Sequence, residues 1–150
     1  MLLEDPLVLL VDDSEDDATL ARIVFERAGF VEPLRIAHDG EEAIAYLRGD
    51  GPFADRRKFP LPAAVLLDLN LPRQNGFEVL AWIRQQPEHR RLRVYVLSAS
   101  SRAEDIQQAY DLGANSYLVK PSTLDELTVV ARGLLAWLKL SHFCATDVAA

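Results

Sequence analysis

Short runs of apolar residues recur along the chain, and each is followed by polar residues and then by a stretch in which apolar residues return every three or four positions. A short apolar run bounded by turn residues predicts a buried strand, whereas a repeat near 3.6 residues predicts an amphipathic helix. Strands are predicted at Leu7–Val11, at Leu34–Ala37, around Val65–Leu67, at Arg93–Leu97 and at Ser116–Val119. Strands and helices are therefore expected to alternate along the chain.

Five helices are predicted after these strands. They cover Ser14–Ala28, a stretch that opens at Asp39-Gly40, a stretch from Asn75 until Pro87 interrupts it, Ala103–Gly113 and Thr123–Leu140. Because each right-handed crossover places a helix against the sheet, this alternation predicts an α/β fold in which helices cover both faces of a parallel sheet. One connection, Gly49–Pro62, is longer than an ordinary αβ loop.

The stretch Ala63–Pro72 forms the centre of the predicted sheet. Its apolar run is typical of a strand buried on both faces, and Asp68 stands where that strand ends. A charge there costs free energy unless it is compensated, and ligands of open α/β sheets bind outside the carboxyl ends of the strands. Four more polar residues stand at or just past other strand ends: Asp12, Asp13, Ser98 and Lys120. Since parallel strands end at the same edge, these five side chains are expected on one rim.

Three carboxylates gathered on that rim would repel one another. Two unit charges about 4 Å apart interact by roughly 4 kcal/mol at an effective dielectric constant of about 20, so a cation is expected among Asp12, Asp13 and Asp68. Oxygen ligands without cysteine or clustered histidine favour Mg²⁺ or Mn²⁺ over Zn²⁺. Together with the ammonium of Lys120 and the hydroxyl of Ser98, this set suits phosphoryl transfer onto Asp68. Asp12 and Asp13 could also simply cap the following helix, which is compatible with metal binding.

Composition narrows the class of protein. The chain has 150 residues, a formal net charge of −7 and a pI near 4.9, which predict one acidic globular domain and argue against nucleic acid as a direct partner. The basic groups Arg56–Lys58 and His89–Arg91 are short enough to be solvated loops. Cys144 is the only cysteine, so neither a disulfide framework nor a cysteine metal site is expected within one chain. The N-terminus lacks the features of a secretory signal and the apolar runs are too short for a membrane span, which predicts a cytosolic protein.

The motifs as a set resemble the receiver domain of bacterial two-component response regulators, over nearly the whole chain. That family carries an acidic pair after the first strand, a phosphoacceptor aspartate after the third, a serine or threonine after the fourth and Lys-Pro after the fifth. Here these residues are Asp12-Asp13, Asp68, Ser98 and Lys120-Pro121. The resemblance implies a flavodoxin-like, CheY-like doubly wound sheet of five parallel strands in the order 2-1-3-4-5 with five helices. Residues 1–141 would form this domain, and residues 142–150 a flexible tail.

The resemblance also implies a ligand set and a partner. The metal would be bound by Asp13, Asp68 and the backbone carbonyl of Asn70, with Asp12 assisting through water. The phosphoryl donor would be a sensor histidine kinase. The chain resembles most the single-domain regulators that accompany bacterial phytochromes. The shared features are the long Gly49–Pro62 loop, the run Asp68–Pro72 and the absence of an effector segment. This closer resemblance implies a phytochrome-type kinase as the phosphoryl donor.

The switch of the family can be placed on this chain as well. Lys120 would pair with the phosphoryl oxygens, and the peptide bond before Pro121 would be cis. Phosphorylation would draw the hydroxyl of Ser98 towards the new oxygens, and Tyr117 would turn inward into the space released. The surface of the fourth helix, last strand and fifth helix would change as a result. The simpler alternative for Tyr117 is an ordinary aromatic residue on an edge strand.

The last predicted helix carries two apolar faces. One face is suited to the core and consists of Leu127, Val130, Ala131, Leu134 and Leu138. The other consists of Val129, Gly133, Ala136 and Leu140, with Trp137 beside it. Since one helix cannot bury both faces on one sheet, this second stripe is predicted to be a surface for a homodimer or another partner. Small residues that are harmlessly exposed are the alternative.

The predicted function is that of a single-domain response regulator, not an enzyme, which accepts a phosphoryl group on Asp68 with Mg²⁺ and signals through protein contacts. A phosphate sink, a phosphorelay intermediate and a pseudo-receiver that only binds a partner are alternatives. A flavodoxin-type electron carrier shares the sheet, but the acidic run Asp12–Asp17 would repel a flavin phosphate. A haloacid-dehalogenase-type phosphatase would need a second acid two residues after the nucleophile, where this chain has Asn70.

Overall fold

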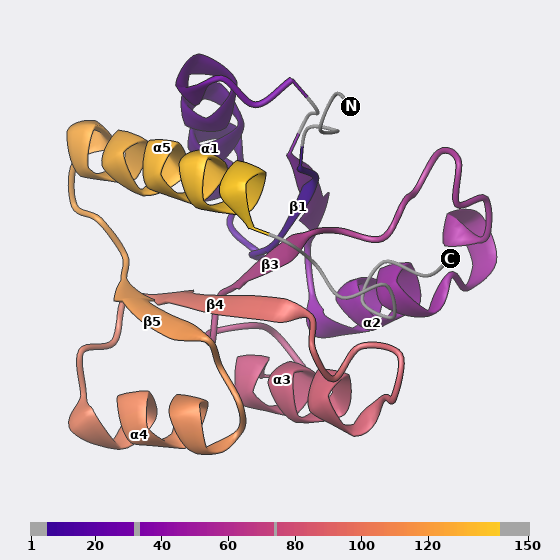
Figure 1. Ribbon diagram of the computed structural model, residues 1–150. Coiled ribbons are helices and arrows are strands. Elements are labelled where there is room, and N and C mark those ends of the chain that lie inside the picture. Colours follow the sequence, from indigo (N-terminus) through magenta and orange to yellow (C-terminus); the bar gives the residue numbers. More distant parts are fainter. Residues whose placement is uncertain (1–5, 32–33, 74, 142–150) are drawn as a thin grey trace.

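The computed structural model describes residues 6–31, 34–73 and 75–141 (Figure 1). The strands are β1 (Val8–Val11), β2 (Arg35–Ala37), β3 (Ala64–Leu67), β4 (Arg93–Ser98) and β5 (Ser116–Val119). The helices are α1 (Glu15–Ala28), α2 (Gly40–Arg48), α3 (Gly76–Gln85), α4 (Ala103–Asp111) and α5 (Leu124–Leu140), with a short 3₁₀ helix, η1 (Gly51–Phe53). Each predicted strand and helix is confirmed to within a few residues. The predicted tail and Cys144 lie outside the described residues.

The five strands form one parallel sheet in the order β2-β1-β3-β4-β5. Helices α1 and α5 cover one face, and α2, α3 and α4 cover the other (Figure 1). The register places Val11 beside Leu67 and Leu67 beside Val96, so the three inner strands finish at the same level. The predicted doubly wound fold is confirmed, and its carboxyl edge is the rim on which the polar residues were expected.

The central strands are buried on both sides, which explains their unbroken apolar sequence. Leu66 faces one core together with Phe25 of α1, while Leu67 faces the other together with Ile83 of α3. A strand between two helical layers has no solvent face, so it shows no alternation of polar residues. The sheet is therefore a rigid base for the loops at its carboxyl edge.

Helix α5 packs with a slightly different face from the one predicted. Ala131 and Leu138 are buried as expected, but the third buried residue is Leu135, and Leu127 and Leu134 are only partly buried. The reason is that α5 packs against α1 as well as against the sheet (Figure 1), and both surfaces together choose the inward face. Periodicity alone could not set that rotation.

The long connection between α2 and β3 is fastened to the domain by one arginine. Arg56 donates hydrogen bonds of 2.7 Å to the carbonyl oxygens of Tyr46 and Leu47, at the carboxyl end of α2. The ring of Tyr46 also packs against Phe53 and Phe59 from this connection. Carbonyl groups at a helix end have no partner within the helix, so Arg56 satisfies them and holds the loop in place.

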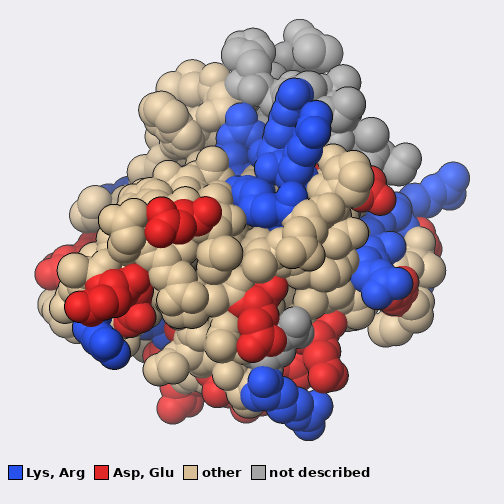
Figure 2. Space-filling view, turned by 90° about the horizontal axis from the view of Figure 1, so that it is seen from below, with Lys and Arg blue, Asp and Glu red and all other residues tan. Residues whose placement is uncertain are grey.

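Charges of both signs are spread over the side of the molecule that carries α3 and α4. Figure 2 shows Lys and Arg side chains at the upper middle and near several edges of this face, with Asp and Glu side chains between them. The face therefore has no uniform sign in a chain whose net charge is −7. Among the described residues, no helix is both long enough and apolar enough to cross a membrane.

Candidate functional site

Three carboxylates meet at the carboxyl edge of the sheet. Asp12 and Asp13 follow β1 and Asp68 follows β3, and oxygens of the three side chains lie within 4.8 Å of one another. Two backbone hydrogen bonds of 3.0 Å extend the sheet to this point, from the N–H of Asp12 to Ala37 and from that of Asp68 to Val11. Asp12 and Asp68 are almost fully buried, whereas Asp13 is exposed. The hard oxygen donors of this cluster fit Mg²⁺ or Mn²⁺, with one side open to solvent.

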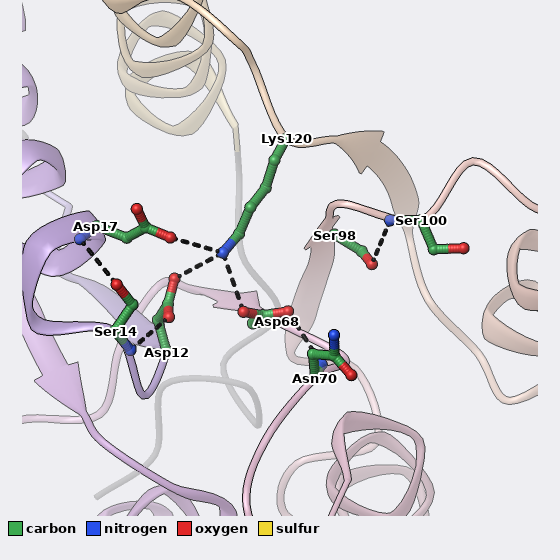
Figure 3. Close-up of polar contacts among 8 residues, drawn as sticks. All are labelled: Asp12, Ser14, Asp17, Asp68, Asn70, Ser98, Ser100 and Lys120. Carbon is green, nitrogen blue, oxygen red and sulfur yellow. Dashed lines mark hydrogen bonds and ion pairs between the residues drawn. The ribbon is translucent and has the colours of Figure 1, made fainter.

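Lys120 crosses the pocket and ends among the carboxylates (Figure 3). Its Nζ lies 3.1 Å from Oδ2 of Asp12, 3.1 Å from Oδ2 of Asp17 and 3.0 Å from Oδ2 of Asp68. Burial by itself would lower the pKa of Lys120, but hydrogen bonding to Asp68 and the charge of that carboxylate, with the bonds to Asp17 and Asp12, raise the pKa above its ordinary value. The ammonium therefore stays charged, and all three of its N–H donors have an acceptor.

Asp68 is buried and remains partly desolvated. Burial raises the pKa of Asp68 above its ordinary value, and the nearby charge of Asp12 raises it further. The hydrogen bond from the backbone of Asn70 and the hydrogen bond and charge of Lys120 lower the pKa, but they do not cancel the effect of burial. The N–H of Asn70 donates to Oδ1 at 3.0 Å, and Lys120 donates to Oδ2. A carboxylate held from both sides, with a more basic oxygen than usual, is arranged to act as a nucleophile.

Glycine at the start of α3 lets that helix approach Asp68. A Cβ atom on Gly76 would collide with the carbonyl oxygen of Asp68 and would lie 2.6 Å from Cα of Leu69. The N–H of Gly76 instead donates to the carbonyl of Leu69 at 3.0 Å. The sequence indicated a turn at Asn75-Gly76, but the need for a residue without a side chain follows only from this close approach.

Ser98 and Tyr117 belong to one hydrogen-bonded chain on the β4 side of Asp68. Ser98 is buried, and its Oγ accepts a hydrogen bond of 3.1 Å from the N–H of Ser100. The hydroxyl of Tyr117 donates to the carbonyl oxygen of Ser100 at 2.8 Å. Its ring packs against a small cluster that includes Val96 and Ala109. Tyr117 is thus tied to the loop that follows Ser98.

The bond before Pro121 differs from the expectation. Within residues 6–31, 34–73 and 75–141 no peptide bond is cis. The Lys120–Pro121 bond is therefore trans, and the prediction of a cis bond is wrong. The trans form of an X–Pro bond is intrinsically favoured by about 0.5–1 kcal/mol. Lys120 reaches its three carboxylates with the trans bond, so the observed pocket does not require the rarer isomer.

Asp17 is the residue of this site that sequence reasoning did not single out. The signal was present, because Ser14 and Asp17 have the Ser-x-x-acid spacing of a helix cap, and the N–H of Asp17 does donate to Oγ of Ser14 at 3.2 Å. That spacing predicts a local role only. Its carboxylate is instead paired with Lys120, 103 residues further along the chain.

The predicted second face of α5 is exposed. Val129 is 71% exposed, Trp137 66% and Leu140 80%, and Gly133 and Ala136 beside them are exposed as well. A groove between this helix and strands β4 and β5 is lined by Tyr95, Leu118, Val129, Leu134 and Trp137 among others. Exposure of the stripe is confirmed, and its use by a partner stays a prediction.

Comparison with known proteins gives one family. The family model described as the response regulator receiver domain matches residues 8–132. Response regulator Rcp1 of Synechocystis sp. is 37% identical over 134 residues, covering 89% of each chain. Its Mn²⁺-bound crystal structure superposes with a TM-score of 0.80 at 36% identity, covering 93% of this chain and 99% of that one.

Two further crystal structures are similar over most of their length. Response regulator RPA3017, in red light signaling of R. palustris, is 40% identical with a TM-score of 0.85, covering 91% of this chain and 96% of that one. The phosphorylated cyanobacterial phytochrome response regulator RcpA is 36% identical with a TM-score of 0.79, covering 87% of this chain and 91% of that one. Both alignments span nearly the whole α/β domain.

Proposed function

Since this chain belongs to the response regulator receiver domain family, a family of phosphoacceptor signalling domains rather than enzymes, we propose that it accepts a phosphoryl group from a sensor kinase histidine onto Asp68, with Mg²⁺ bound. The observation that carries the proposal is the placement of Asp68. Its carboxylate is buried among two other carboxylates and one ammonium, at the edge where the sheet presents ligands. A structural aspartate would not need this arrangement.

In the proposed transfer an oxygen of Asp68 attacks the phosphorus of the phosphohistidine. The new P–O bond forms as the P–N bond breaks, and the imidazole nitrogen keeps the electron pair of the broken bond. Charge on the transferring oxygens would be stabilised by the ammonium of Lys120 and by the hydroxyl of Ser98, which stand beside Asp68. The lysine already points at Asp68 from 3.0 Å.

The cation would be held by Asp12, Asp13 and Asp68. The family resemblance adds the backbone carbonyl of Asn70 and a water-mediated role for Asp12. When bound, Mg²⁺ supplies positive charge to the carboxylates and to the oxygens of the transferring group. The proposal is supported by the spacing of the three carboxylates and by the existence of an Mn²⁺-bound form of the similar protein Rcp1.

The readout of phosphorylation is proposed to run through Ser98 and Tyr117. If the Ser98 hydroxyl moves to a phosphoryl oxygen, it loses the hydrogen bond that it accepts from the N–H of Ser100. The carbonyl oxygen of Ser100 in turn accepts a hydrogen bond from the hydroxyl of Tyr117. The loop before α4 and the ring of Tyr117 would then shift together. This hydrogen-bonded chain favours the switch over a purely passive aromatic residue.

A phytochrome-type histidine kinase is the proposed donor. The support is the similarity to RcpA and Rcp1 and to a regulator of red light signaling, each over most of its length. The exposed stripe of α5, together with α4 and β5, is the proposed surface for a homodimer. Apolar side chains as exposed as Val129 and Leu140 favour coverage by a partner.

The test is direct phosphorylation of the intact chain. Wild-type protein and Asp68→Asn are incubated with acetyl phosphate, with and without Mg²⁺, and the intact mass is followed over time. We expect the wild type to gain one phosphoryl group only with Mg²⁺, and the Asp68→Asn protein to gain none. Asp111→Asn, an exposed aspartate at the end of α4 whose carboxylate accepts from Gln107, is the matched control and should label like the wild type. A wild-type protein that never gains the mass would contradict the proposal and favour a pseudo-receiver.

A further inference from the structure

Four helices of this fold begin with the same cap arrangement, and the acidic residue of α1 is used differently from those of α2 and α5. In α1, α2, α3 and α5 the cap side chain accepts from the backbone N–H three residues later, where an acidic residue stands. In α2 the carboxylate of Glu42 turns back and accepts from the N–H of His38 at 3.0 Å. In α5 Glu126 likewise accepts from Ser122 at 3.3 Å. These two carboxylates serve the backbone just ahead of their own helix.

In α1 the corresponding carboxylate reaches across the pocket. Oδ2 of Asp17 lies 3.1 Å from Nζ of Lys120 (Figure 3). The N–H of the cap residue Ser14 donates to Oδ1 of Asp12 at 2.9 Å, so it is not available to the carboxylate of Asp17. Aspartate is also one methylene shorter than glutamate. The carboxylate of Asp17 is therefore aimed at Lys120, and only its backbone N–H takes part in the helix cap, as a donor to Ser14.

We infer that Asp17 is a positioning residue that holds the Lys120 ammonium on the α1 side of the pocket and must release it when phosphoryl oxygens arrive on Asp68. The inference rests on the proposed function. An ammonium has three N–H donors, and here Asp12, Asp17 and Asp68 occupy all three. A phosphoryl oxygen can become a partner of Lys120 only if one of these acceptors gives way.

Asp17 is the acceptor best placed to give way. It lies outside the set of carboxylates that come within 4.8 Å of one another, Asp12, Asp13 and Asp68. Its side chain is 50% exposed, against 3% for Asp12 and 7% for Asp68, so water can replace Lys120 at Asp17 at little cost. Asp17 consequently competes with the phosphoryl group for the lysine and slows phosphorylation.

The experiment compares Asp17→Asn with Asp16→Asn. Both substitutions remove one negative charge from the first turn of α1, and Asp16 is exposed and makes no contact with Lys120 among the described residues. The cap survives in both, because it uses the backbone N–H of residue 17. Phosphorylation by acetyl phosphate at saturating Mg²⁺ is followed by intact mass. Binding of beryllofluoride, a non-reacting analogue of the phosphoryl group, is measured by calorimetry.

We expect Asp17→Asn to label about threefold faster and to bind beryllofluoride about threefold more tightly than wild type, and Asp16→Asn to match wild type in both measurements. A purely structural role of Asp17 would not tighten beryllofluoride binding. Equal shifts in the two variants would assign the effect to net charge and overturn the inference, as would unchanged or slower labelling of Asp17→Asn. A wild-type protein that is never labelled overturns the proposed function itself, whereas a labelled wild type with an unaltered Asp17→Asn overturns only the role of Asp17.

Discussion

Oδ2 of Asp68 lies 3.0 Å from Nζ of Lys120, although 52 residues separate them in the sequence and strand β4 lies between their strands. The lysine side chain bridges that strand at the open edge of the sheet. The carboxylate it meets is 7% exposed. This contact connects the loop after β5 to the centre of the acidic cluster, and most of the chemistry proposed for the chain depends on it.

Lys120→Met should destabilise the protein in the absence of divalent cations. Methionine keeps the apolar stem but leaves the buried carboxylates of Asp12 and Asp68 without their cation. We expect a loss of about 2–3 kcal/mol in the free energy of unfolding, below the full penalty for breaking a buried pair because Lys120 is partly exposed. Urea unfolding in EDTA checks this value.

Two controls test whether the loss of stability in Lys120→Met comes from the uncompensated carboxylates. Added Mg²⁺ should restore part of the lost stability, because a bound cation compensates the same carboxylates. Arg132→Met, on an exposed position of α5, should change stability little. An unfolding free energy of Lys120→Met equal to that of wild type in EDTA would show that the triple contact contributes nothing.

Gly76→Ala should disturb Asp68 from outside the acidic cluster. The new Cβ would collide with the backbone of Asp68 and Leu69, so we expect a loss of about 2–3 kcal/mol in stability and slower phosphorylation. Gly133→Ala is the matched control, since a Cβ there meets no atom within 4 Å. Because alanine favours a helix over glycine by about 0.8–1 kcal/mol, that variant should gain stability. Similar losses in both variants would argue against the close approach of α3 to Asp68.

His89 should make the protein less stable in mild acid. Burial lowers the pKa of His89 below its ordinary value of 6.5, and the charge of Arg56 acts in the same direction. The charge of Glu88 and the hydrogen bond with the backbone of Leu47 raise the pKa, but by less. The unfolded chain therefore takes up the proton first as the pH falls below about 6.5, so stability decreases from there towards the lower folded pKa.

His89→Gln removes that titration. The fall in Tm between pH 7 and pH 5 should be about 3 °C smaller in His89→Gln than in wild type, although packing against Trp82 is lost at every pH. Trp82→Phe, which alters the same ring contact but keeps the imidazole of His89, serves as the control and should keep the wild-type pH dependence. Parallel pH curves for wild type and His89→Gln would refute the assignment.

The stripe on α5 should support self-association. Val129→Glu combined with Leu140→Glu places two charges on the most exposed apolar positions of α5, and we expect dimer affinity to fall at least about tenfold. Sedimentation velocity with and without beryllofluoride measures the change. Arg132→Glu, on the same helix but outside the stripe, should sediment like the wild type. Unaltered sedimentation of the double variant would exclude this surface.

Local sequence was sufficient for the strands, the helices and the identity of the rim. The apolar runs of β1 and β3 contain no alternating polar residues because both faces of each strand are covered. Each run therefore predicts a buried strand without reference to the rest of the chain. Parallel strands must end at one edge. Asp12, Asp13 and Asp68 could therefore be placed together from their positions alone, and the structure brings them within 4.8 Å.

Other features were decided only when distant segments packed together. The spacing of Ser14 and Asp17 is that of an ordinary helix cap, yet the carboxylate of Asp17 pairs with Lys120. Leu135 enters the core because α1 and the sheet together orient α5. Pro121 follows a trans bond, and Gly76 is needed because α3 approaches Asp68. Sequence periodicity fixes each element and its apolar side, since those depend on neighbours a few residues away. Distances between side chains on different elements depend on how the whole domain packs, and only the tertiary structure contains them.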